Sequence, residues 1–199
     1  YGLNDNNKVT MHSVDLTNAY IYDIVDETYD KLPLLGKRMF LAGINNNNSV
    51  VGFYWDVENG RLKNGLYRGF IYTNGSYVLL DHPIVNLNFS DPDWDTVEGT
   101  LPTDINNKGQ VVGYLWHRDS DISECFFYDK GTWKVISHPS GLPLEIEGLN
   151  DYGYMVGSLH YVDDEGYDVY VGVRYNVHTE EWLTLTLPEE WQVSAVKPT

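Results

Sequence analysis

Ile105-Asn106-Asn107-Lys108-Gly109-Gln110-Val111-Val112-Gly113 is one of four related segments in this chain, and the others begin at Leu3, Ile44 and Leu149. All four have Ile or Leu, then Asn, then Asn or Asp, and then Asn or Gly at the fifth place. Asn and Gly tolerate positive φ, and an Asn or Asp side chain can hydrogen-bond to its own backbone. Each segment therefore predicts a tight turn between two short strands.

A second block of sequence follows each turn. Tyr22, Tyr72 and Tyr128 each precede a proline by 11 residues, and Tyr175 precedes Pro188 by 13. Between these anchors lie Tyr29, Tyr77, Trp133 and Trp182, each of which opens an alternating or apolar run. Asn74-Gly75 and Lys130-Gly131 are typical of hairpin turns. Two further strands are therefore expected after each Asn turn.

Four antiparallel strands over about 45 residues match the size of one propeller blade. The sequence predicts an all-β, four-bladed β-propeller as a single domain over residues 1–199, with negligible helix. Its repeats cover approximately 1–35, 36–92, 93–140 and 141–190, and a strand at 191–196 is expected to pair with the first blade and close the ring. Two alternatives stay open: a fragment of a longer propeller, or two chains that combine their blades.

The motif Ile-Asn-Asn-x-Gly-x-Val-Val-Gly, followed by an aromatic-rich strand, resembles the HAF-type extracellular repeats of bacteria. Residues 105–114 with 126–128 form the cleanest copy, and the resemblance covers essentially the whole chain. The first copy departs from the pattern, because Thr10-Met11 replaces Val-Gly, and the fourth departs in its third strand at Val173-Arg174-Tyr175. The resemblance implies an exported protein built from β repeats. The resemblance implies no catalytic residues for this chain.

The composition excludes several classes of protein. Of the 199 residues, 13 are Lys or Arg and 29 are Asp or Glu, so the formal net charge is −16. This charge repels phosphate backbones and anionic lipids, so nucleic acid is excluded as a partner. No apolar run approaches the length of a membrane span, so membrane insertion is not expected. A single cysteine excludes a disulfide framework, and Tyr1 in place of Met indicates that a preceding segment was processed away or cut.

Aromatic and histidine side chains near the ends of the expected second strands are the candidate ligand-binding residues. Rings of this kind beside amides and carboxylates form the usual surface for stacking a sugar or another flat ligand. The set comprises Tyr54, Trp55, Tyr114, Trp116, His117, His160 and Tyr161.

Clustered carboxylates in the expected loops are candidates for a calcium site, because calcium takes six to eight oxygen ligands. Asp91, Asp93 and Asp95 alternate along one loop, but Pro92 stiffens it and no EF-hand pattern is present. Solvated surface is the simpler interpretation in so acidic a chain. The repeated asparagines are likewise best explained by turn geometry rather than by a central ion.

The sequence predicts a secreted or cell-surface module, monomeric, that binds a glycan or similar surface molecule at the propeller mouth and needs no cofactor. The alternative is an enzyme with an axial active site, such as a polysaccharide lyase, a hydrolase or a small-molecule cyclase. A third possibility is a purely structural segment of a larger surface protein. No nucleophile, phosphate-binding or dinucleotide motif is present to favour catalysis.

Overall fold

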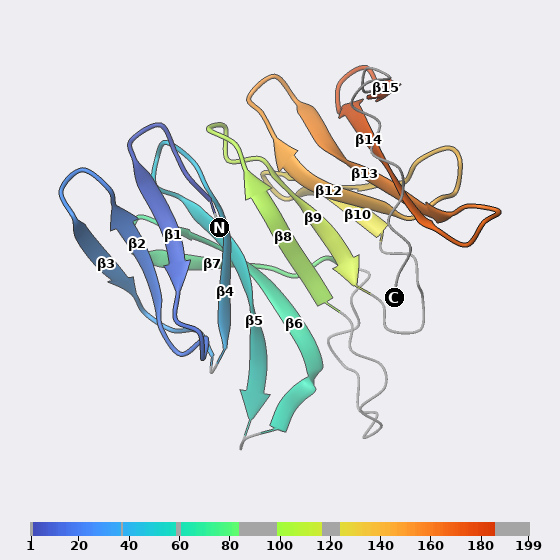
Figure 1. The fold of residues 1–199 in the computed structure, drawn as a ribbon. Coiled ribbons are helices and arrows are strands. Elements are labelled where there is room, and N and C mark those ends of the chain that lie inside the picture. The colour runs from blue at the N-terminus through green and yellow to red at the C-terminus, as the bar shows by residue number, and fades with distance from the viewer. Residues whose placement is uncertain (1, 37, 59–60, 84–98, 117–123, 186–199) are drawn as a thin grey trace.

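The computed structural model describes residues 2–36, 38–58, 61–83, 99–116 and 124–185, with side chains left out of the description over 56–66. These residues form an all-β structure, as the sequence predicts, and contain no helix that could cross a membrane. The strands follow one another in four antiparallel groups, which we call units 1 to 4. Figure 1 shows the units side by side, from unit 1 on the left to unit 4 on the right.

Each unit is a meander in which consecutive strands pair antiparallel. Unit 1 has β1 (Lys8–His12), β2 (Ala19–Asp23) and β3 (Thr28–Leu32). Unit 2 has β4 (Met39–Ile44), β5 (Val50–Glu58), β6 (Arg61–Thr73) and β7 (Ser76–Leu80). Unit 3 has β8 (Gly99–Ile105), β9 (Val111–Trp116), β10 (Glu124–Asp129) and β11 (Thr132–Ile136). Unit 4 has β12 (Leu144–Leu149), β13 (Tyr154–Val162), β14 (Asp168–Asn176) and β15 (Trp182–Thr184).

The predicted turns are confirmed in detail. The fifth residue of each Asn turn has positive φ: Asn7 at 58°, Asn48 at 57°, Gly109 at 79° and Gly153 at 80°. Within each turn, the first Asn side chain accepts hydrogen bonds from two backbone N–H groups, as Asn106 Oδ1 does from Lys108 and Gln110. Asn74-Gly75 and Lys130-Gly131 have positive φ at both positions, which matches the right-handed twist of the strands that they connect.

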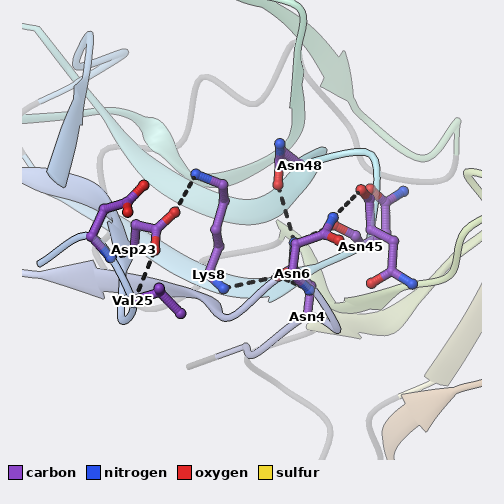
Figure 2. Close-up of polar contacts among 9 residues, drawn as sticks. Asn4, Asn6, Lys8, Asp23, Val25, Asn45 and Asn48 are labelled. Carbon is purple, nitrogen blue, oxygen red and sulfur yellow. Dashed lines mark hydrogen bonds and ion pairs between the residues drawn. The ribbon is translucent and has the colours of Figure 1, made fainter. Parts of the chain in front are cut away.

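The four Asn turns also bond to one another in a chain that we call the asparagine ladder. The side-chain amides of Asn4, Asn45 and Asn106 donate to the backbone carbonyls of Asn45, Asn106 and Asn150, at 2.9, 2.9 and 3.1 Å. A more exposed second row runs beside it, in which the backbone N–H groups of Asp5, Asn46 and Asn107 donate to the side chains of Asn46, Asn107 and Asp151. The first step of the ladder, between units 1 and 2, is drawn in Figure 2. The ladder fixes the spacing of the four units along one edge of the molecule.

Three apolar cores lie between successive units. Ala19, Ile21 and Leu32 of unit 1 pack against Met39, Leu41 and Phe70 of unit 2. Val51 and Leu80 of unit 2 pack against the Leu115 and Phe126 side chains of unit 3. Val112 and Cys125 of unit 3 pack against Ile146 and Val173 of unit 4. Each unit thus buries one face on its neighbour, which is where most of the favourable free energy of folding arises.

The predicted propeller of four four-stranded blades is wrong. The strands form sheets of three, eight and four strands, and no sheet closes on itself within the described residues. The eight-stranded sheet arises because β6 extends past the short β7, so that Tyr67 pairs in parallel with Gly99 of β8. Gly99 permits this approach, since a Cβ there would lie 2.6 Å from the Tyr67 Cβ. Among the described residues before β1, Leu3 forms an isolated bridge to Val9. The predicted closing strand at 191–196 lies outside the described residues.

Asp104 connects unit 3 to unit 4 at a position where units 2 and 4 have Gly43 and Gly148. Its two carboxylate oxygens accept hydrogen bonds from the N–H groups of Ile105 and Leu149, both at 2.8 Å. Gly43 leaves the space for this side chain, because a Cβ there would lie 2.6 Å from Asp104 Oδ1. Burial raises the pKa of Asp104, and the two backbone hydrogen bonds oppose that shift only in part.

A pH-dependent stability is expected from this carboxyl. Because its pKa is higher in the folded state, its contribution favours folding below the ordinary value of 3.8 and is lost as pH rises through the folded pKa. As pH falls from 7 to 4, the wild type should therefore become more stable relative to Asp104→Asn, as judged by the free energy of unfolding. Urea unfolding at several pH values measures this difference, and a value independent of pH would contradict the assignment.

Candidate functional site

A row of partly exposed aromatic rings crosses units 1 to 3 near the ends of the strands that lie away from the asparagine ladder. We call it the aromatic row, and its members are His12, Phe40, Phe53, Trp55, Tyr67 and Trp116. Successive ring centroids are 5.9 Å apart for His12 and Phe40, 4.7 Å for Phe40 and Phe53, and 5.7 Å for Phe53 and Tyr67. Tyr67 then contacts both tryptophans edge to face, at 5.3 Å to Trp55 and 5.4 Å to Trp116. These spacings are those of favourable aromatic pairs.

The row follows from strand alternation and from the pairing of β6 with β8. Phe53 and Trp55 are two residues apart on β5, so their side chains leave the same face of the sheet. The parallel pairing of Tyr67 with Gly99 places β6 beside β8, and Gly99 in turn pairs with Trp116 at the end of β9. Tyr67 is therefore the ring that links units 2 and 3.

Polar groups accompany the rings at Trp55. The exposed Arg38 places its guanidinium carbon 4.7 Å from the centre of the Trp55 ring, in a cation–π contact. The indole N–H of Trp55 is buried and has no hydrogen-bond partner among the described residues. Burial raises the pKa of Tyr67, although the Arg38 charge opposes the shift, so its hydroxyl stays protonated. The site thus combines flat apolar faces with hydrogen-bond donors.

Of the candidate ligand-binding residues, Trp55 and Trp116 lie together, and both contact Tyr67. Tyr54 lies on the opposite face of β5 and is only 5% exposed, within the core between units 1 and 2. Tyr114 donates a hydrogen bond of 3.0 Å to Glu147 of unit 4, and burial raises its pKa. Both tyrosines therefore serve packing between units.

The other candidates are separate from the aromatic row or lie outside the described residues. His160 and Tyr161 are on β13 of unit 4, and the His160 ring stacks on Tyr170 at 4.8 Å with its Nε2 2.8 Å from Asp168 Oδ1. Neither has a ring contact with the tryptophans among the described residues. His117, together with the calcium candidates Asp91, Asp93 and Asp95, falls outside the description.

Neither a metal centre nor an activated thiol is evident in the described part of the chain. No group of three or more His, Cys, Asp or Glu residues there could hold a metal ion. Cys125 is fully buried and its thiol donates to the carbonyl of Leu144. Burial is the main cause that raises the pKa of this thiol to about 12, and the charges of Glu145 and Glu147 add to the shift. The thiolate that a nucleophile requires is therefore not available.

The four Asn turns line a polar hollow of about 250 Å³ on the surface. Its lining includes Asp104 and both rows of the asparagine ladder. The side-chain atoms of Asn4, Asn45 and Asn106 are already committed to bonds within and between turns. The repeated asparagines are accounted for by this structural role.

Sequence reasoning missed four members of the aromatic row: His12, Phe40, Phe53 and Tyr67. The alternation of Phe53 with Trp55 was a usable signal, because residues two apart on a strand share a face. Tyr67 gave no such signal, since its place depends on a parallel pairing with a strand in the next unit.

Comparison with known proteins finds a similar fold among solved structures but no matching family. No family model and no curated protein matches the chain. Among solved structures, the crystal structure of the tricorn protease matches with a TM-score of 0.58 at 12% identity. The match covers 94% of this chain but 16% of the tricorn protease chain. At this identity the likeness concerns the arrangement of strands alone.

Proposed function

We propose that this protein is an exported glycan-binding or adhesion module that uses the aromatic row as its binding surface. The observation that carries the proposal is the continuity of the rings: six partly exposed rings from three units follow one another at contact distance. Partly exposed rings in such a row are unusual on a soluble domain, where aromatic side chains pack inside or at interfaces.

The chemistry of the row fits a sugar better than a purely apolar ligand. The flat faces of pyranose rings carry C–H groups that stack on indole and phenol rings, while their hydroxyls need hydrogen-bond partners. The Arg38 guanidinium is a donor at the middle of the row, and the Tyr67 hydroxyl both donates and accepts. A neutral or acidic glycan could use these donors.

Binding is favoured over catalysis because the described members of the row offer flat stacking faces rather than carboxylates. Its ionisable members are His12 and Tyr67, and burial lowers the pKa of His12, which keeps the imidazole neutral. Glycoside cleavage normally requires two carboxyl groups flanking the bond. The HAF-type resemblance, which implies export, is consistent with a surface or secreted location.

A glycan screen tests the proposal directly. The intact protein is probed against an array of bacterial and host polysaccharides, and the strongest binders are titrated with the wild type and with Trp116→Ala. We expect Trp116→Ala to weaken binding by about tenfold, because loss of one stacking ring costs on the order of 1 to 2 kcal/mol.

The matched control is Tyr152→Ala, which removes an aromatic ring that is 77% exposed in the fourth Asn turn, away from the row. Its affinity should equal that of the wild type, and circular dichroism should show that both variants are folded at the temperature of the titration. Absence of binding to every glycan, or equal loss in both variants, would overturn the proposal.

A further inference from the structure

Backbone hydrogen bonds to two neighbouring segments hold Arg38 beside the aromatic row. The N–H of Trp55 donates to the Arg38 carbonyl at 3.1 Å, which continues the pairing of β4 with β5 one residue beyond Met39 and Tyr54. The N–H of Met39 donates in turn to the carbonyl of Leu16 in unit 1, at 3.2 Å. Because residues opposite each other on antiparallel strands share a face, the Arg38 side chain lies on the face that carries Trp55.

The Arg38 side chain contacts the row and is exposed to solvent. Its guanidinium carbon lies 4.7 Å from the centre of the Trp55 ring. Burial raises the pKa of Tyr67, and the nearby Arg38 charge opposes this shift. Phe40, two residues after Arg38, leaves the same face of β4 and stacks on Phe53 at 4.7 Å. A positive charge is thus fixed near the middle of the row.

No carboxylate of the described residues neutralises this charge. Three other basic side chains form ion pairs: Lys8 with Asp23, Arg68 with Asp81, and Lys134 with Glu180. Figure 2 shows the first of these pairs. Arg38 has no such partner in the part of the chain that the structure describes, although the sequence has 29 acidic residues and 13 Lys or Arg. Its guanidinium N–H groups are therefore available to an anionic group from outside the chain.

We propose that the aromatic row binds sugars that carry a carboxylate, and that Arg38 holds the carboxylate of a uronic acid unit. This inference rests on the glycan-binding function proposed above. A pyranose that stacks on Tyr67 projects an equatorial carboxylate sideways, roughly in the plane of the sugar, toward Arg38. The guanidinium then donates two parallel hydrogen bonds to the two carboxylate oxygens. Because Arg38 already packs on Trp55, it loses little side-chain freedom when the sugar binds.

The charge of the whole chain limits how many acidic units a favoured ligand carries. The formal net charge of −16 repels a polyanion, and at 0.1 M salt this repulsion extends over about 10 Å. Arg38 compensates for one carboxylate at hydrogen-bond distance but not for a long series of them. The favoured ligand is therefore a largely neutral glycan with isolated uronic acid units, rather than a polyuronide.

Titration calorimetry with matched sugars tests the proposal on the intact chain. The probes are four neutral oligosaccharides that each carry one terminal uronic acid, which is glucuronic, galacturonic, mannuronic or guluronic acid, together with the methyl ester of each. The ester keeps the sugar and its stacking face but removes the charge. We expect at least one acid to bind about tenfold more tightly than its ester. The same oligosaccharide with a sulfate ester in place of the carboxylate should bind more weakly than the acid, because the planar carboxylate matches the guanidinium fork.

Variants of Arg38 show whether this residue causes the preference. Arg38→Gln should bring acid and ester to within about twofold of each other and leave the affinity for the ester unchanged. Arg38→Lys keeps the charge without the planar fork, so it should retain only part of the preference. The matched control is Arg174→Gln, because Arg174 is an exposed arginine in the same kind of contact, 4.6 Å from the Tyr154 ring in unit 4. It should bind both sugars as the wild type does.

The outcomes separate this inference from the proposed function. Trp116→Ala should weaken acid and ester alike and leave their ratio unchanged. Equal affinities of the wild type for every acid and its ester, or a preference that Arg38→Gln retains, would overturn the role of Arg38 and leave glycan binding in place. Tighter binding of a sulfate ester than of every acid would assign the row to sulfated glycans instead. If no acid binds, the inference is wrong, whereas the proposed function is judged by the wider glycan array.

Discussion

Asn45→Ala is expected to lower the free energy of unfolding by about 3 to 4 kcal/mol, a large fraction of the 5 to 15 kcal/mol typical of a whole domain. Asn45 is 4% exposed and its side chain makes three hydrogen bonds. Its Oδ1 accepts from the N–H groups of Asn47 and Ser49, both at 3.0 Å, and its Nδ2 donates to the carbonyl of Asn106 at 2.9 Å. Alanine leaves the N–H groups of Asn47 and Ser49 without this acceptor, and the carbonyl of Asn106 keeps only its bond from the Gly109 N–H. A buried unpaired group costs about 1 to 3 kcal/mol.

Two effects combine in this one substitution. Loss of the Oδ1 contacts loosens the turn between β4 and β5, and loss of the Nδ2 contact separates unit 2 from unit 3. Asn47→Ala is the matched control, because Asn47 is exposed and its side chain makes one ladder bond, of 3.2 Å, to Asn107. It should cost less than about 1 kcal/mol. Chemical denaturation measures the free energy of unfolding of both variants. Equal losses would show that the buried row of the ladder stabilises the protein no more than an exposed bond does.

The turns were predictable from sequence because their determinants are local. A residue with positive φ at the fifth place and an Asn at the second are needed for the turn itself, whatever surrounds it. The same argument gave Lys130-Gly131, where lysine adopts a φ of 48° beside a glycine at 93°. Local interactions of this kind form in the same way whatever the arrangement of the units.

The arrangement of the units was not predictable in the same way. Whether β6 ends with β7 or continues to meet β8 depends on contacts between residues far apart in the chain, such as Tyr67 with Gly99. Counting strands per repeat gave blades of four, whereas pairing across units produced sheets of three, eight and four. Alternating patterns indicate strands but contain no information on which strand of another unit will lie alongside.

The candidate site likewise contains some residues that could be predicted from the sequence and others that could not. Trp55 and Trp116 were found from sequence because they stand at equivalent places after the repeated glycine. Tyr54 was included for its proximity to Trp55, but alternation places it on the buried face. The ring that joins the two tryptophans, Tyr67, could be found only once the two units were placed together.

Gly113→Ala is expected to destabilise the protein by about 3 to 5 kcal/mol. A Cβ at this position would lie 2.2 Å from the carbonyl oxygen of Leu101 and 2.7 Å from the Cα of Pro102. Both contacts are with the backbone of β8, which pairs with β9 and cannot move aside as a flexible side chain could. Relief requires β8 to shift away from β9, which would strain its parallel pairing with β6 and the hydrogen bond that Asp104 accepts from Leu149 of unit 4.

Gly172→Ala is the control, because Gly172 is also a glycine within a β-strand. Gly172 lies inside β14, and a Cβ there would meet the Leu185 side chain at 3.4 Å, an ordinary contact. Because alanine loses less backbone entropy on folding than glycine, Gly172→Ala should be neutral or stabilising by up to about 1 kcal/mol. Met11→Ala extends the comparison to unit 1, because Met11 stands seven residues after the first Asn of its turn, as Gly113 does, and is 44% exposed. If thermal unfolding showed Gly113→Ala to be as mild as these two changes, the close approach of β8 to β9 would be wrong.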